Sequence, residues 1–172
     1  MSEAAVGQAA ALLTNGAVTM LLVGNLALTE RCLELVNQIS QKTGARVYCD
    51  TFFTRMPRGE GRCEIDRLAY FAEQGVEQIK DVSQLIMVGT KAPVAFFAYP
   101  EKPSEYYGPG SVLHTLADVS QDAEDALSRL ALAVGAEGLT PIKTPLNKSA
   151  KGADELSSRT VAMSFAHYLP TQ

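Results

Sequence analysis

Three short stretches of the sequence carry residues that could bind an anion such as a phosphate. The first is Gly24-Asn25-Leu26, which follows a run of apolar residues and precedes a helix expected to start at Thr29. Free N–H groups at a helix start attract anions. A dinucleotide fingerprint, however, needs three glycines in the pattern GxGxxG, and only Gly24 is present; no GK[ST] phosphate loop occurs either. The stretch is either a nucleotide contact or an ordinary tight turn.

The second stretch lies after the next expected strand, where Arg55, Arg58 and Arg62 share a loop with two glycines. Guanidinium groups bind phosphate through paired hydrogen bonds, so this loop predicts a phosphate contact, with Arg58 as a candidate. The alternative is a solvated or interface loop in which the arginines pair with acids such as Glu60 and Glu64.

The third stretch, Gly89-Thr90-Lys91, follows a strand expected at residues 84–88. Lys91 could contact a phosphate there or could be a surface lysine. A group of aromatic residues comes next, comprising Phe96, Phe97, Tyr99, Tyr106 and Tyr107. These rings could belong to the core or to a face that contacts another subunit, and we expect the two last tyrosines to lie at an interface.

The sequence offers little for catalysis or metal binding within the chain. His114 lies inside an apolar strand and His167 on a terminal helix, and a structural role is expected for both. Cys32, Cys49 and Cys63 have no CxxC spacing, which favours three reduced, buried thiols over a zinc or disulfide framework. Neither a GxSxG nor an HExxH pattern occurs. No catalytic or metal-binding residue is therefore predicted.

The composition restricts the class of protein. The chain has 172 residues, 47% of them apolar, and a net charge of −4, which suits one domain with a real core. Its lysines and arginines are scattered, so no nucleic-acid partner is expected. The longest strongly apolar run is too short to span a bilayer, and no basic leader precedes it, so we expect no membrane partner and a cytoplasmic location.

Strands and helices are expected to alternate along the chain. Strands are predicted at 17–23, 45–49, 84–88 and 111–115, with a further strand or extended segment at 93–98 and an irregular loop at 50–68. Helices are predicted at 2–13, 29–44, 72–80, from Ser120 or Asp122 to about 134, and from 157 onward. This alternation predicts an α/β fold: a Rossmann-like, doubly wound, mostly parallel sheet of five to six strands with helices on both faces.

The position of the three stretches matches this fold. In open α/β sheets, ligands bind beyond the carboxyl ends of the strands, where the strand order reverses. We expect one such domain at residues 1–135. Residues 136–156 have the proline, glycine and lysine content of a linker, and residues 157–172 form a terminal helix that could fold back or begin a further domain.

Several segments together resemble one family. AAALLTNGAVTMLLVGNLAL, GARVYCDTFF and SQLIMVGTKAPVAFFAYPEKPS resemble the central domain of thiamine-diphosphate-dependent enzymes of the acetolactate synthase and benzoylformate decarboxylase type. The loop MPRGEGR…IDRLAYF and the segment SVLHTLAD are similar to acetolactate-synthase-large-subunit-like proteins. The resemblance covers about residues 4–135.

The resemblance implies a parent enzyme with three domains that have different roles. In the family, an amino-terminal domain grips the cofactor's pyrimidine, and a carboxy-terminal domain binds diphosphate and magnesium through a GDG…N motif. The central domain has a six-stranded doubly wound sheet and holds FAD, ADP or nothing. No GDG occurs here. Thiamine diphosphate and magnesium are thus expected in the parent enzyme and not on this chain, and no catalytic or metal residue of the family maps onto it.

The resemblance therefore implies an isolated central domain, structural and inactive alone, of a carboligase or decarboxylase acting on 2-oxo acids. Its expected partners are the missing amino- and carboxy-terminal domains, in a parent enzyme that forms a homo-oligomer, and the terminal helix would begin the missing carboxy-terminal domain. Residues 24–26 and 89–91 align with the crevice that holds ADP or FAD in some members. Two alternatives stay open: a working ADP or FAD site in that crevice, and a free-standing Rossmann-like nucleotide-binding protein.

Overall fold

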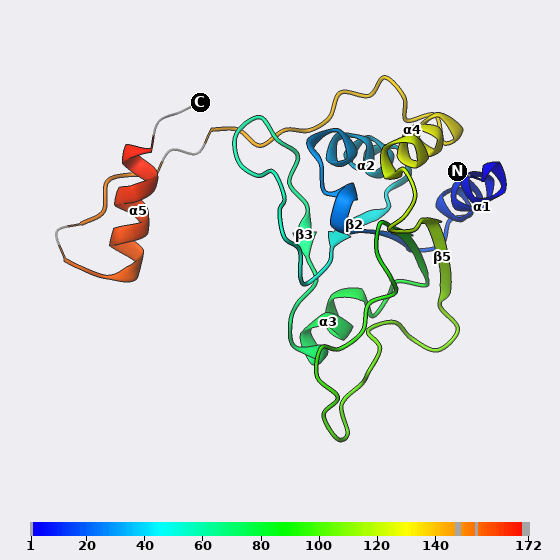
Figure 1. Ribbon diagram of the computed structural model, residues 1–172, viewed down its shortest axis with the longest axis horizontal. Helices are drawn as coiled ribbons and strands as arrows, with labels where there is room; N and C mark the ends of the chain where they lie inside the picture. Colours follow the sequence, from blue (N-terminus) through cyan, green and yellow to red (C-terminus); the bar gives the residue numbers. More distant parts are fainter. Residues whose placement is uncertain (1, 147–148, 154, 170–172) are drawn as a thin grey trace.

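The computed structural model describes residues 2–146, 149–153 and 155–169. Five parallel strands form one sheet in the order β3-β2-β1-β4-β5 (Figure 1). The strands are β1 (Thr19–Val23), β2 (Arg46–Cys49), β3 (Asp66–Arg67), β4 (Gln84–Val88) and β5 (Val112–Ala117). The strand order reverses between β1 and β4, so the predicted doubly wound α/β fold is confirmed.

The helices cover the two faces of the sheet unequally. On one face lie α1 (Glu3–Thr14), α2 (Glu30–Thr43) and α4 (Ala123–Ala133), while in the described part of the chain α3 (Ala72–Ile79) is the only helix on the other (Figure 1). The central strand β1 packs on both faces of the sheet. Leu21 and Val23 lie in the core with α1, α2 and α4, and Met20 and Leu22 lie in the core with α3. All five residues of β1 are buried, which explains why its sequence is apolar after Thr19.

Local sequence signals set the starts of the helices. The Thr29 side chain accepts a hydrogen bond from Cys32 N (3.2 Å), so α2 begins where its cap predicted. At α4 the cap is Asp122 and not Ser120: its carboxylate accepts from the backbone N–H groups of Glu124 and Asp125, each at 3.0 Å.

The fifth strand differs from the prediction. Residues 93–98 were expected to form a strand or an extended segment, but they contain only an isolated antiparallel bridge between Val94 and Glu105. The fifth strand is instead β3, which forms one of the two edges of the sheet and lies inside the segment expected to be an irregular loop. Its two residues, Asp66 and Arg67, are both exposed, so no apolar alternation marks them in the sequence.

The expectation that Tyr106 lies at an interface was wrong. This side chain is only 3% exposed, and its hydroxyl donates to the carbonyl oxygens of Ala69 (3.2 Å) and Tyr70 (3.3 Å). Its ring fills the space that Gly75 leaves on α3, where any side chain would collide with it. Tyr107 is partly buried against the same cluster. The sequence could not reveal that a helical glycine makes room for a ring 31 positions later.

The segment with linker composition begins as part of the domain. Ala136 is fully buried, the backbone N–H of Ile142 donates to Asn37 on α2 (2.8 Å), and Lys143 pairs with Glu34 at 2.7 Å. Residues 136–144 therefore lie against α2.

The last helix is separate from the sheet. It is α5 (Ser158–Tyr168), begins with a capping box at Ser157, and has no buried side chain among its described residues. Figure 1 shows it away from the other helices. No helix in the described part of the chain has the length and apolar character needed to cross a bilayer.

Candidate functional site

The carboxyl ends of three strands meet at one crevice. Gly24 follows β1 and donates its N–H to Val88 O at the end of β4 (3.0 Å), while Asp50 N, after β2, donates to Val23 O (3.3 Å). The side-chain amide of Asn25 donates to Gly89 O (2.8 Å). The structure thus brings together the first and third predicted stretches, residues 24–26 and 89–91.

Both glycines of the crevice are required by close packing of the backbone. Gly24 has an ordinary extended backbone (φ −146°), but a side chain there would collide with the carboxylate of Asp50 and with Thr90. Gly89 has φ +67°, and a Cβ on it would lie 2.6 Å from the carbonyl oxygen of Gly24. The close approach of these chain segments explains why both positions are glycine, and a bound phosphate is not needed to explain them.

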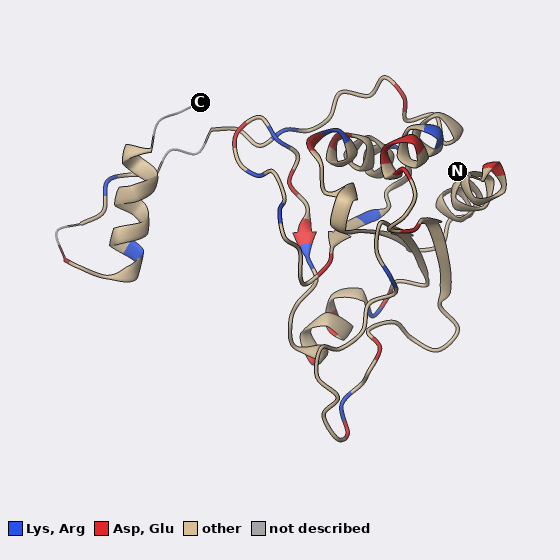
Figure 2. Ribbon diagram, in the orientation of Figure 1, with Lys and Arg blue, Asp and Glu red and all other residues tan. Residues whose placement is uncertain are grey.

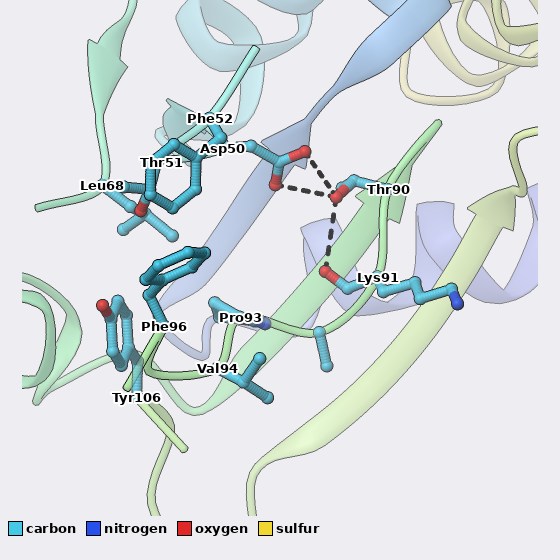
Figure 3. Close-up of a pocket in the computed structure, with 11 residues that line it drawn as sticks. Asp50, Thr51, Phe52, Leu68, Thr90, Lys91, Pro93, Val94, Phe96 and Tyr106 are labelled. Atoms are coloured by element: carbon cyan, nitrogen blue, oxygen red, sulfur yellow. Dashed lines mark hydrogen bonds between the residues drawn. The ribbon is translucent and has the colours of Figure 1, made fainter. Parts of the chain in front are cut away.

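A carboxylate that the sequence did not single out occupies the centre of the crevice. The hydroxyl of Thr90 lies 2.7 Å from each carboxylate oxygen of Asp50 and donates to it (Figure 3). Burial raises the pKa of Asp50, and the hydrogen bond from Thr90 opposes that shift. An acid directly after the second strand of a doubly wound sheet is the signal that could have indicated this position.

One pocket opens beside this pair. Its volume is about 270 Å³, with the polar pair Asp50 and Thr90 at one end and apolar walls formed by residues such as Phe52, Phe96 and Tyr106. Lys91 also lines it, but Figure 3 shows its ammonium group pointing away from Asp50. The pocket is therefore apolar with one acidic end, and that end would repel a phosphate.

A second pocket lies on the other side of the first turn. It has a volume of about 430 Å³, and its lining includes Asn25 and Leu26 from the turn and Arg55 and Arg62 from the loop before β3. Leu26 is 77% exposed. Figure 2 shows several basic residues in this loop among acidic ones. This is where arginines approach the amino-terminal end of α2.

The predicted residues therefore fall at three places. Thr90 and Lys91 line the first pocket, and Asn25 and Leu26 line the second. Arg58 lines neither and instead faces a third pocket of about 250 Å³ together with Asn37, Ser40, Val47, Glu64, Ile65 and Asp66. Arg62 lies 3.8 Å from Glu30, so part of its charge is already offset.

The histidines and cysteines have structural environments. His114 is buried, with Nε2 2.8 Å from the carbonyl oxygen of Ala5, and His167 Nδ1 lies 3.0 Å from Ser149 O. All three cysteines are buried and free. Burial raises the pKa of each thiol, that of Cys49 to about 11, which disfavours the reactive thiolate. Among the described residues, no three His, Cys, Asp or Glu side chains are placed to hold a metal ion.

Comparison with known proteins gives one curated relative. No family model matches the chain. The chain is 40% identical over 137 residues to IlvX of Mycobacterium tuberculosis, provisionally named an acetolactate synthase large subunit. The match covers 80% of this chain but only 26% of the relative, so the chain spans about a quarter of that protein's length.

Solved structures share the fold. A provisionally assigned thiamin diphosphate-dependent enzyme from Mycobacterium smegmatis superposes with a TM-score of 0.61 and 20% identity over 91% of this chain and 33% of the other. The thiamine diphosphate-dependent 4-hydroxybenzoylformate decarboxylase of Rhodococcus jostii superposes with a TM-score of 0.60 and 17% identity, over 90% of this chain and 31% of the other. The benzoylformate decarboxylase of Polynucleobacter necessarius superposes with a TM-score of 0.56 and 19% identity, over 91% of this chain and 32% of the other.

The sequence match and the shared fold agree with the resemblance read from the segments around β1, β2 and β4. By sequence this chain is similar to about a quarter of the acetolactate-synthase-like relative, and its fold is shared with about a third of each of these thiamine-diphosphate-dependent enzymes.

Proposed function

We propose that this chain is the central domain of a thiamine-diphosphate-dependent enzyme that joins or decarboxylates 2-oxo acids, and that the chain alone is structural and not catalytic. The observation that carries the proposal is the 40% identity to an acetolactate-synthase-like relative of which the chain matches about a quarter. The proposed partners are the remaining domains of the same enzyme, in a homo-oligomer.

The residues of this chain support a structural role. In the described part, the crevice is closed by contacts between protein groups, namely Thr90 with Asp50 and Asn25 with Gly89. No described cluster of ligands fits magnesium, and the single acid of the crevice would repel a diphosphate. Thiamine diphosphate, which acts as an electron sink for carbanions, would be held by other regions of the enzyme.

A second candidate function is a nucleotide site for ADP or FAD. The observation that favours it is the second pocket, where Arg55 and Arg62 approach the turn before α2. The occupied centre of the crevice weighs against it, because a pyrophosphate that approached Gly24 would meet the carboxylate of Asp50.

Thermal unfolding of the purified chain separates the two candidates. We expect no shift of the midpoint with ADP, FAD, NAD or magnesium thiamine diphosphate, each at millimolar level. A ligand at about 100 times its dissociation constant would add about 2.7 kcal/mol of stability. A shift with ADP or FAD, lost in the variant Arg55→Ala but kept in the surface control Arg159→Ala, would favour the nucleotide site. A shift with magnesium thiamine diphosphate would overturn the proposal.

A further inference from the structure

Six aromatic side chains form one exposed surface at the carboxyl edge of the sheet. This aromatic surface consists of Phe52, Tyr70, Phe71, Phe96, Phe97 and Tyr99, whose exposed fractions run from 38% to 59%. Its members come from three segments that are far apart in sequence. Contiguous exposed apolar area of this kind is rare on a free monomer and usually indicates a contact with another protein surface.

The rings touch one another continuously. Phe96 contacts three of the other rings, with ring centroids 4.9 Å from Phe52, 4.7 Å from Phe97 and 6.0 Å from Tyr70. Phe71 extends the surface from Tyr70 at 5.2 Å. Figure 3 shows the rings of Phe52 and Phe96 side by side at the rim of the first pocket. The rings hold one another in place, so the surface is preformed.

The sheet face on this side is also incompletely covered. Leu113 on β5 pairs in register with Leu85 on β4, so both side chains point to the face that carries α3. Leu85 is fully buried, whereas Leu113 is 40% exposed. Parallel sheets normally bury both faces, and here three helices cover one face and a single eight-residue helix the other (Figure 1). A second region of the same side thus lacks cover.

One ion pair flanks the aromatic surface. Glu73, close in sequence to Phe71, forms an ion pair with Lys102, which is close to Tyr99. The six rings themselves are apolar, and the charges of this flanking pair offset each other, as is usual around the buried centre of a protein interface. An apolar partner surface fits it better than a charged ligand does.

We propose that another domain of the same thiamine-diphosphate-dependent enzyme docks on the aromatic surface. This inference rests on the proposed function. The length of the relatives identifies the occupant: the chain spans 26% of the curated relative and 31% to 33% of the solved enzymes, so most of their mass lies outside it. A partner of domain size would cover both the aromatic surface and the open part of the sheet face.

Hydrogen exchange tests the docking directly. The probe is a chimera of the M. tuberculosis relative in which the 137 matched residues are replaced by those of this chain. We expect the peptide 94–99 to exchange at least about tenfold more slowly in the chimera than in the isolated chain, because docking excludes water from it. Equal exchange in a chimera that binds magnesium thiamine diphosphate would overturn the docking, while a folded chimera that does not bind the cofactor would count against the proposed function instead.

A matched pair of variants separates docking from folding. Phe96→Ser changes an exposed ring of the aromatic surface, and Leu132→Ser changes an exposed leucine on α4, on the opposite face of the sheet. We expect both to leave the melting temperature of the isolated chain unchanged and only Phe96→Ser to lower that of the chimera. Equal effects in the chimera would overturn the proposal, as would a dimer of the isolated chain by light scattering with concentration-dependent protection of 94–99.

Discussion

Space and charge at single residues determine what the crevice can hold. Gly24, Asp50 and Thr90 come from three different strand ends and pack so closely that no side chain fits at position 24. The sequence identified the glycine and the threonine as crevice residues. It could not identify the contact with Asp50, because a hydrogen bond between positions 40 residues apart leaves no local pattern.

Substitution of Gly24 tests the packing at this crossing. Gly24→Ala should destabilise the chain by about 1–3 kcal/mol, the usual cost of forcing a methyl group into a filled site. Gly7→Ala is the control, since nothing lies within 4 Å of a Cβ there and alanine favours the α1 helix by about 1 kcal/mol. Urea unfolding of both variants measures the difference, and equal stability of the two would contradict the close contact.

The raised pKa of Asp50 gives a dependence of stability on pH. A carboxyl whose pKa is raised on folding favours the folded state while it is protonated, and this contribution is lost as pH rises from the ordinary pKa of 3.8 through the raised pKa of the folded state. Asp50→Asn keeps an acceptor for Thr90 but does not titrate. We expect the stability of the variant relative to the natural chain to increase between about pH 3 and about pH 7. Urea unfolding at several pH values in this range measures the free energy of unfolding of both chains. A difference between the two free energies that stays constant with pH would contradict a raised pKa of Asp50.

At the scale of elements, apolar continuity and caps made most of the fold predictable. The fully buried strands β1 and β4 are apolar after their first residues, Thr19 and Gln84, and α2 starts at its threonine cap. The two-residue strand β3 and the docked segment 136–144 carry no periodic signal, and only tertiary contacts define them. The same holds for Tyr106, which is buried because α3 has a glycine opposite it.

The cap of α4 can be tested by two alanine substitutions. Asp122→Ala should cost about 1 kcal/mol of stability, because the backbone N–H groups of Glu124 and Asp125 lose their acceptor. Ser120→Ala, at the alternative cap position predicted from the sequence, should have a much smaller effect. Thermal or urea unfolding compares them, and a larger loss for the serine variant would show that the cap is assigned incorrectly.

Truncation tests whether the segment 136–144 belongs to the domain. A chain ending at residue 146 should unfold at nearly the same urea concentration as the full chain, because the removed α5 buries no described side chain. A chain ending at 135 should lose about 2 kcal/mol or more, since it lacks the buried Ala136 and the packing of Leu139 on the core. Equal stability of the two truncated chains would make 136–144 a true linker.

At the scale of the whole molecule, the chain resembles one part of a larger enzyme. Its sheet is covered well on one face and thinly on the other, and an aromatic surface lies exposed on the thin side. The sequence predicted the class of sheet and indicated the resemblance to known enzymes, both of which depend on local segments. It did not predict which face is left open, because that depends on how helices distribute over the sheet.

Cofactor binding by the chimera tests whether this chain is the central domain of a thiamine-diphosphate-dependent enzyme. Isothermal titration with magnesium thiamine diphosphate would compare the isolated chain, the chimera and the intact M. tuberculosis relative. We expect no binding by the isolated chain and binding by the chimera within about tenfold of the relative, a difference of about 1.4 kcal/mol at most. Binding by the isolated chain, or loss of binding by a chimera that still folds, would contradict the assignment of this chain as a central domain.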